Sequence, residues 1–269
     1  MRLRDKTWLE DGERRRQVDP APAAPDEAFF GFERIEARQK TARVISHFNS
    51  VAAVYDFMNT LLSLGIHHAW KRASVRLLGL RPGERVLDVC GGTGDLARLA
   101  AARVGPAGRV VIYDINRAML EAGIRRGPDR PGGGRIRHVQ GDAEQISFPD
   151  GVFDAAMVGF GIRNVSRMRQ GFAEMHRVLT PGGRLMCLEF SRPVSTFFRG
   201  LYDAYSFYAM PFLGELLAGS RRAYTHLPES IRMFPLPDEL ADMLRGVGFE
   251  RVVYRRFTNG IAVAHLAVK

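Results

Sequence analysis

The sequence predicts an α/β fold built around a mostly parallel sheet, and three observations indicate it. Residues 85–114 read as an apolar strand, a glycine-rich turn, a helix and a second strand, which together are a βαβ unit. Strand and helix patterns continue to alternate as far as residue 246. Two β-type runs within residues 251–268 then close the chain as a hairpin.

The other elements are expected to assemble around the βαβ unit. Its first strand is Arg85–Cys90, an apolar run typical of a buried parallel strand. Residues 91–94, with the sequence GGTG, form the turn, and Asp95 begins a helix with apolar residues at helical spacing. The second strand, Val110–Tyr113, is followed directly by Asp114.

This turn and Asp114 predict a nucleoside-binding site. Glycine has no Cβ, so the backbone at Gly91, Gly92 and Gly94 can approach a ligand closely, and a carboxylate twenty residues after Gly94 can accept hydrogen bonds from both ribose hydroxyls. Asp88 and Asp95 lie beside the turn and would repel a pyrophosphate. They favour S-adenosylmethionine, whose sulfonium and ammonium groups are positive. A glycine-rich turn that binds nothing is the alternative.

Further elements follow at regular intervals. Helical patterns cover 116–126, 167–179 and 237–246, and strand patterns cover 135–140, 153–161, 184–190, 251–257 and 261–268. The sequence Thr258-Asn259-Gly260 joins the last two strands and is a hairpin signal.

Polar residues follow two of these strands, where an α/β sheet binds its ligands. Asp142 comes after strand 135–140 and is placed to accept from the exocyclic amine of a base, although aspartate is also common in turns. Arg163 and Asn164 come after strand 153–161. Because an arginine and an asparagine are costly to bury without partners, both are candidates for function.

The domain boundaries follow from composition and periodicity. Residues 1–38 are charged and proline-rich and are expected to be a mobile extension, and residues 39–269 the folded domain. Within it, 39–80 has two helical apolar stripes and is expected to form a cap. The segment 194–236 is crowded with aromatics and is expected to be a helical insertion that walls a channel for a long apolar ligand, rests on a membrane, or simply packs into the core.

Two adjacent histidines, His67 and His68, lie in the cap and are candidate active-site residues. On a helix their side chains diverge by about 100°, so no metal site is expected from them. Cys90 and Cys187 fall in predicted strands and are expected to be buried apolar residues in a reducing cytoplasm. No signal peptide or spanning helix is expected.

The formal charge of +10 on 269 residues raises the question of nucleic-acid binding. The basic residues are scattered, and no compact basic patch with interleaved aromatics is present, so no nucleic-acid partner is expected. The positive charge is compatible with an anionic membrane surface or with solubility alone.

Several motifs together resemble the C-methyltransferases of ubiquinone and menaquinone biosynthesis, the demethylmenaquinone methyltransferase and 2-methoxy-6-polyprenyl-benzoquinol methylase family. The resemblance covers about residues 44–269, and GFGIRNV together with ESIRMFP is its most specific part. Other matching stretches are SVAAVYDFMN, SLGIHHAWKR, LDVCGGTGDLA, GDAEQISFPDGVFD, EMHRVLTPGGRLMCLEFSRP and YSFYAMPFLGELLAG.

The resemblance implies a class I S-adenosylmethionine-dependent methyltransferase, with a Rossmann-like seven-stranded sheet whose last strand is antiparallel. Family contacts to the cofactor map onto Thr93, Asp114, Asp142 and Ala143. A further contact, often a serine in the family, is Gly159 here, which removes a side-chain hydrogen bond.

The resemblance also implies C-methylation of a polyprenylated quinol, either demethylmenaquinol or the benzoquinol, with another lipid or a small phenol as the alternative acceptor. Arg163 is expected to stabilise the phenolate and Asn164 to orient a hydroxyl or a water. A water beside Arg163, or His67 or His68, is expected to accept the proton. Peripheral contact with the inner face of a membrane and a homodimer remain open.

Overall fold

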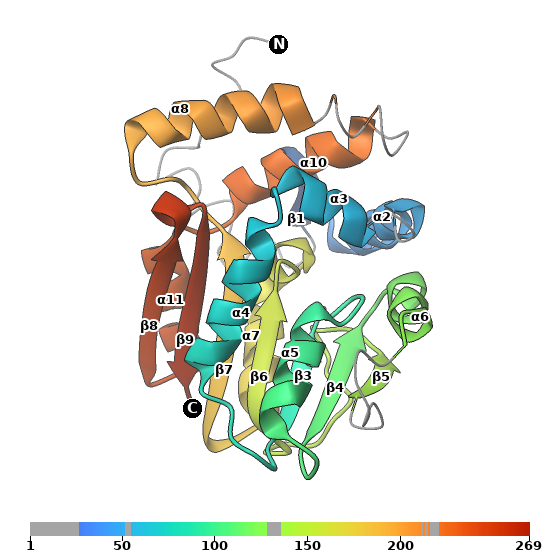
Figure 1. Ribbon diagram of the computed structural model, residues 1–269, viewed down its shortest axis with the longest axis vertical. Coiled ribbons are helices and arrows are strands. Elements are labelled where there is room, and N and C mark those ends of the chain that lie inside the picture. The colour runs from blue at the N-terminus through green and yellow to red at the C-terminus, as the bar shows by residue number, and fades with distance from the viewer. Residues whose placement is uncertain (1–26, 52–54, 128–135, 211, 213–214, 216–220) are drawn as a thin grey trace.

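The computed structural model describes residues 27–51, 55–127, 136–210, 212, 215 and 221–269, and one seven-stranded sheet dominates it. The strand order is β5-β4-β3-β6-β7-β9-β8 (Figure 1). Every pair is parallel except those that β9 makes with β7 and β8, so the last strand of the chain runs against the others, as predicted. The strands are β3 (Arg85–Val89), β4 (Arg109–Asp114), β5 (Ile136–Gln140), β6 (Phe153–Gly159), β7 (Leu179–Phe190), β8 (Arg251–Phe257) and β9 (Ala262–Val268).

Helices cover both faces of the sheet. On one face α4 (Ile66–Leu78), α5 (Asp95–Val104) and α6 (Arg117–Arg125) bury apolar residues against the strands, and on the other α7 (Met168–Val178) and α11 (Pro237–Val247) do the same. The strands in the middle are apolar on both faces because both faces are covered. Among the described residues, no helix has the length and apolar character needed to cross a bilayer.

The βαβ unit forms where the sequence predicted it. The first strand is one residue shorter than predicted: β3 ends at Val89, and Cys90, with φ of 53°, begins the turn and is only half-buried. Cys187 lies buried in β7, as expected. The predicted hairpin turn is η5 (Thr258–Gly260) between β8 and β9.

The cap and the insertion lie together beyond the carboxyl ends of the parallel strands (Figure 1). The helices α2 (Ala37–Val51) and α3 (Tyr55–Leu62) precede α4, while α8 (Thr196–Ala204), the π-helix η4 (Tyr205–Ala209) and α10 (Arg221–Met233) follow β7. The buried Arg232 of α10 pairs with Asp203 of α8, and its guanidinium stacks 4.0 Å from the Phe207 ring. This ion pair fixes the two halves of the insertion to each other.

A two-stranded hairpin lies inside the predicted extension. Strands β1 (Glu27–Phe30) and β2 (Glu33–Glu36) pair antiparallel and contact α2, whereas residues 1–26 lie outside the described residues. Ala28 and Ile35 are buried against the domain. Residues 27–38 therefore contain a hairpin and the start of α2, which the composition did not indicate. Strands of four residues are too short for an apolar pattern to stand out among charged neighbours.

Candidate active site

A cavity of about 600 Å3 lies at the carboxyl edge of the sheet, between the sheet and the cap and insertion helices. Ten of the twelve candidate site residues line it. They are His67, Gly91, Gly92, Thr93, Asp114, Asp142, Ala143, Gly159, Arg163 and Asn164. The strand ends bring them together from distant parts of the sequence. Gly94 and His68 are not among the described residues that line the cavity.

The glycine-rich turn is held against Asp114. The Gly92 N–H donates to Asp114 Oδ2 and the Asn116 N–H to Oδ1, both at 2.8 Å. Burial raises the pKa of Asp114, and these two N–H groups oppose the rise. Each carboxylate oxygen keeps a lone pair for a ribose hydroxyl. At Gly91 a Cβ would lie 2.9 Å from the Asp88 carboxyl group, so the turn leaves no room for a side chain there.

Asp88 is a buried carboxyl group whose oxygens accept no well-formed hydrogen bond from the described residues, although the backbone N–H of Ala97 lies close enough to lower its pKa. It lines the cavity next to the turn. Burial raises its pKa to about 8. A cationic ligand beside these oxygens would favour the ionised form, because an opposite charge compensates for lost hydration. An orphaned acid, a close backbone turn and Asp114 therefore fit S-adenosylmethionine.

The charge of Asp95 is already compensated, which corrects one part of the prediction. Lys71 Nζ lies 2.7 Å and Arg126 Nη1 3.0 Å from the Asp95 carboxylate. Burial would raise the pKa of Asp95, but the two cations bring it well below its usual value. Asp95 therefore adds little net negative potential at the turn, and among the acids at the turn it is Asp88 and Asp114 that suit a cationic ligand.

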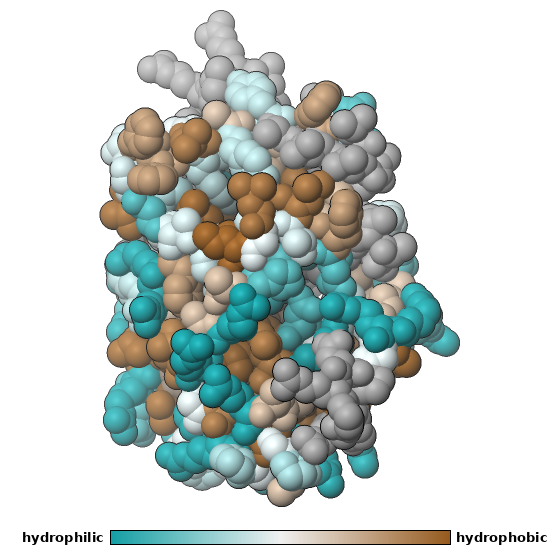
Figure 2. Space-filling model, viewed as in Figure 1, coloured by the Kyte–Doolittle hydropathy of each residue, from teal (hydrophilic) through white to brown (hydrophobic). Residues whose placement is uncertain are grey.

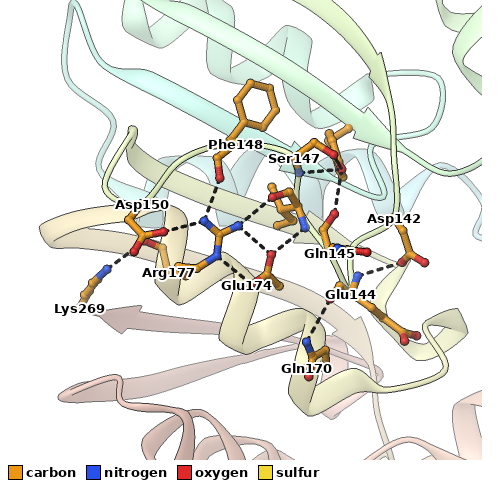
Figure 3. A network of polar contacts seen from close by, with 12 residues as sticks. Asp142, Glu144, Gln145, Ser147, Phe148, Asp150, Gln170, Glu174, Arg177 and Lys269 are labelled. Atoms are coloured by element: carbon orange, nitrogen blue, oxygen red, sulfur yellow. Dashed lines mark hydrogen bonds and ion pairs between the residues drawn. The ribbon is translucent and has the colours of Figure 1, made fainter. Parts of the chain in front are cut away.

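The segment after β5 that carries Asp142 and Ala143 is fixed by a polar network (Figure 3). Asp142 Oδ1 accepts from the Glu144 N–H at 2.9 Å, and Arg177 of α7 donates to the carbonyls of Ile146 and Phe148. These bonds hold the backbone so that Asp142 and Ala143 face the cavity. Asp142 thus forms the turn and lines the cavity, and its contact with the base of the cofactor remains a prediction.

Gly159 and Gly94 are places where a Cβ would press on a neighbouring side chain. A Cβ on Gly159 would lie 2.5 Å from Leu96 Cδ1, and one on Gly94 would lie 2.6 Å from Ile112 Cδ1. Gly94 has φ of 84° and precedes α5. Its role is therefore to let α5 pack closely on β4, and a direct ligand contact from Gly94 remains a prediction.

Arg163 has a buried acidic partner that the sequence did not suggest. It lies in η3 (Ile162–Asn164), and its Nη1 is 2.9 Å from Glu189 Oε2 at the end of β7. Burial raises the pKa of Glu189 and the guanidinium opposes this. Arg163 Nε has no partner among the described residues. The only sequence signal for Glu189 is one acid in an otherwise apolar strand.

His67 and His68 are closer together than helical geometry suggested. Their ring centroids are 3.9 Å apart, and one ligand atom from each and one from Asp95 all lie within 4.8 Å of one another. The reasoning from diverging side chains was therefore wrong. Lys71 and Arg126 nevertheless form ion pairs with the Asp95 carboxylate, which a metal would need as a ligand. His67 Nδ1 lies 2.6 Å from Ser63 Oγ, and its burial lowers its pKa to about 4.

Two other histidines in the cavity wall were missed by the sequence reasoning. His47 comes from α2 and His226 from α10, and their ring centroids lie 5.6 Å apart. His226 also stacks on Phe30 of β1, with centroids 3.8 Å apart. Neither histidine follows a strand. His226 lies in the stretch YTHLPESIRMFP, which resembles the family, but the resemblance assigned it no role.

Solved structures with this fold include a SAM-dependent methyltransferase from Aquifex aeolicus, with a TM-score of 0.55 and 18% identity, covering 74% of this chain and 88% of that one. A SAM-dependent methyltransferase from Thermotoga maritima has a TM-score of 0.59 and 19% identity over 83% of this chain and 99% of that one. At this level of identity the two likenesses show a shared fold, the seven-stranded sheet with one antiparallel strand.

The profile of the ubiE/COQ5 methyltransferase family matches residues 36–269. The ubiquinone/menaquinone biosynthesis C-methyltransferase of Stutzerimonas stutzeri is 46% identical over 94% of this chain and 99% of its own length. That of Azotobacter vinelandii is 47% identical over 89% and 95%. The chain belongs to the ubiE/COQ5 methyltransferase family, as its motifs predicted. It is an S-adenosylmethionine-dependent C-methyltransferase of ubiquinone/menaquinone biosynthesis.

Proposed function

We propose that the chain methylates a ring carbon of a polyprenylated quinol, with demethylmenaquinol preferred over 2-methoxy-6-polyprenyl-1,4-benzoquinol. One observation carries the prenylated acceptor: the cavity that begins at the glycine turn ends at an apolar mouth. The preference between the two rings comes from the resemblance of the stretch GIHHAWK to menaquinone-type members of the family. Leu64, Ile66, Phe198 and Leu201 line the cavity and are also exposed to solvent. A ring can bind beside Arg163 while an apolar tail leaves through this mouth.

The chemistry of a quinol fits the polar end of the cavity. S-adenosylmethionine supplies the methyl group when bound at the turn. Loss of a phenolic proton raises electron density at the neighbouring ring carbon, which then attacks the methyl group. Arg163, fixed by Glu189, is placed to stabilise the phenolate, and Asn164 in the same turn can orient the hydroxyl. The apolar lining keeps water from the reacting carbon.

We further propose that the mouth rests on an anionic membrane surface. Exposed apolar side chains gather over α8 and the junction of α3 and α4 (Figure 2). Leu64 is 91% and Phe197 76% exposed, and Val194, Tyr208 and Phe212 are also exposed. A prenyl tail has its lowest free energy in lipid, and the chain's charge of +10 favours anionic headgroups. The alternative is that a second copy of the chain covers this face and forms a homodimer.

The acceptor is tested with purified protein and reduced quinones. Demethylmenaquinol should be methylated faster than the prenylated benzoquinol, and both faster than soluble phenols. A strain that lacks this gene should accumulate demethylmenaquinone. Transfer to soluble phenols alone would overturn the prenylated acceptor, and faster benzoquinol methylation would reverse the preference.

The membrane surface is tested by flotation with vesicles that contain anionic lipid. Changing Leu64 and Phe197 to serine should lower the bound fraction several-fold and leave S-adenosylmethionine affinity unchanged. Val253, which is also exposed but lies on β8, provides the control substitution. Sedimentation that shows a dimer dissociated by the same two substitutions would assign the face to a second copy instead.

A further inference from the structure

We propose that the imidazole of His226 accepts the hydroxyl proton of the acceptor ring, with His47 as the second ring of the pair. This role rests on the proposed function, because it requires a phenolic acceptor in the cavity. It gives the reaction a proton acceptor that is distinct from Arg163, His67 and His68.

The position of His226 on α10 is fixed by contacts with two other elements, β1 and α2. Its ring lies nearly parallel to that of Phe30 of β1, at 12°, and meets the His47 ring of α2 at 65°. It lines the cavity, and His226 Nδ1 is buried without a hydrogen-bond partner among the described residues. A buried polar nitrogen without a partner is costly, so its retention beside a ligand cavity points to a group that the ligand supplies.

The pair lies near Arg163, the residue proposed to stabilise the phenolate. Both α2 and α10 contact the 3-10 turn η3 that carries Arg163. Lys40 of α2 also donates to the Val165 carbonyl at 2.8 Å, which ties α2 to the end of that turn. An acceptor hydroxyl that reaches the guanidinium is thereby brought to the side of the cavity where the two imidazoles lie.

The charged and titratable groups around the pair keep both rings neutral. Burial lowers the pKa of His226 to about 3, with His47, Arg163 and Lys40 adding to the effect. Burial, then Arg163, also lowers the pKa of His47. The rings are therefore neutral at neutral pH, and they hold a proton only while a negative charge lies beside them. A phenolate that forms between the ring and the guanidinium supplies the negative charge that an imidazolium needs in this position.

Other titratable groups are less well placed or less able to accept this proton. The guanidinium itself stays protonated. Glu189 is engaged by that guanidinium through its carboxylate. Burial raises the pKa of Tyr202 to about 12, so it is a hydrogen-bond donor. His67 is bonded to Ser63 and lies among the cations around Asp95.

The step balances as follows. The hydroxyl proton passes to a nitrogen of His226, and the ring carbon forms a bond to the methyl carbon while the S–CH3 electron pair returns to sulfur. The ring carbon then loses its hydrogen as a proton to water, and His226 returns its proton to the oxygen. The products are the methylated quinol, the demethylated thioether and one proton.

The test compares His226→Phe with wild type and with the control His176→Phe. Phenylalanine keeps the stacking on Phe30 and removes the basic nitrogen. His176 packs on Phe249 outside the cavity lining. The readouts are single-turnover methyl transfer to short-chain demethylmenaquinol from pH 6 to 9.5, S-adenosylmethionine affinity by calorimetry, and the melting temperature.

His226→Phe should lower the rate at pH 7.5 by about 100-fold or more. Cofactor affinity and melting temperature should change little. The variant's log rate should rise with pH with a slope of 1, because hydroxide then removes the proton, whereas the wild-type rate is flat above pH 7. The double variant His47→Phe/His226→Phe should be only slightly slower than His226→Phe, because the two rings act as one unit.

A wild-type rate and a flat profile in His226→Phe would overturn the proposal. So would a rate loss that matches the losses in cofactor affinity or melting temperature and shows no change of slope. A wild-type protein that binds S-adenosylmethionine but methylates no quinol would overturn the proposed function, and the role of His226 with it.

Discussion

The Thr93 hydroxyl donates a hydrogen bond of 2.9 Å to Asp56 Oδ1, so the cofactor turn is tied directly to the cap helix α3. The other Asp56 oxygen lies 2.6 Å from Arg126 Nη1, which also contacts Asp95 at the start of α5. These contacts connect α3, the glycine turn, the start of α5 and the end of α6. The residue that the family resemblance assigns to the cofactor is thus also the residue that fixes the cap.

Asp56→Ala should therefore weaken S-adenosylmethionine binding by about 5- to 10-fold, because the turn loses its fixed contact with the cap. The ion pairs are partly exposed, so the melting temperature should fall only slightly. Asp56→Asn keeps an acceptor for Thr93 and provides the control, with affinity near that of wild type. Calorimetry measures the S-adenosylmethionine affinity of each variant. If Asp56→Ala binds as tightly as Asp56→Asn, the cap does not support the turn.

Arg163→Ala should lower turnover by at least 100-fold and S-adenosylmethionine affinity by less than about 3-fold, because the proposed role of the guanidinium is toward the acceptor and not the cofactor. Glu189→Gln leaves a buried guanidinium with no carboxylate and should cost about 3 kcal/mol of stability.

The double variant Arg163→Ala/Glu189→Gln separates catalysis from folding. It removes both buried charges, so its stability should exceed that of Glu189→Gln while turnover stays low. Urea unfolding and steady-state kinetics on the same preparations measure both quantities. Turnover equal to that of wild type in Arg163→Ala would exclude the guanidinium from the reaction.

Gly159→Ser restores the side chain that is frequent in the family but should destabilise this chain by about 1–2 kcal/mol, since its Cβ would lie 2.5 Å from Leu96 Cδ1. Leu96→Ala removes the side chain that a residue at position 159 would meet, and it destabilises the core by itself. The two substitutions together should therefore cost at least 0.5 kcal/mol less than the sum of the single changes. Additive free energies of unfolding would mean that Leu96 does not restrict position 159.

How far the sequence could predict this site depends on the geometry of each part. Residues at strand ends, such as Asp114, Asp142 and Arg163, were predictable because parallel strands bring their carboxyl ends to one edge. Glu189 and His226 were not, because their partners Arg163 and Phe30 lie far away in the sequence and no local pattern connects them. These are contacts of tertiary structure.

The same limit applies to charge. Asp95 looked like a free negative group beside the turn, but Lys71 and Arg126 come from 24 residues before it and 31 residues after it and neutralise it. The sequence shows which residues carry charge. Which of those charges remain uncompensated depends on how α4 and the end of α6 pack around α5.

The stability of the domain should decrease in mild acid because of His265 in β9. This side chain is buried, its Nε2 lies 2.9 Å from the Pro237 carbonyl, and burial lowers its pKa to about 4. Asp238 and Arg256 act on the ring in opposite directions, and Tyr254 packs against it. The folded state binds a proton there less readily than the unfolded chain does.

The sign and the size of this effect follow from linkage. Above about pH 6.5 the ring is neutral in both states and its contribution to stability is complete. As pH falls from 6.5 to 4 the unfolded chain takes up the proton first, so about 3 kcal/mol is lost over this range. His265→Gln keeps a donor for the Pro237 carbonyl and does not titrate. In urea titrations the unfolding free energy of His265→Gln should therefore fall by about 3 kcal/mol less than that of wild type between pH 6.5 and 4. Parallel pH curves for the two proteins would refute the role of His265.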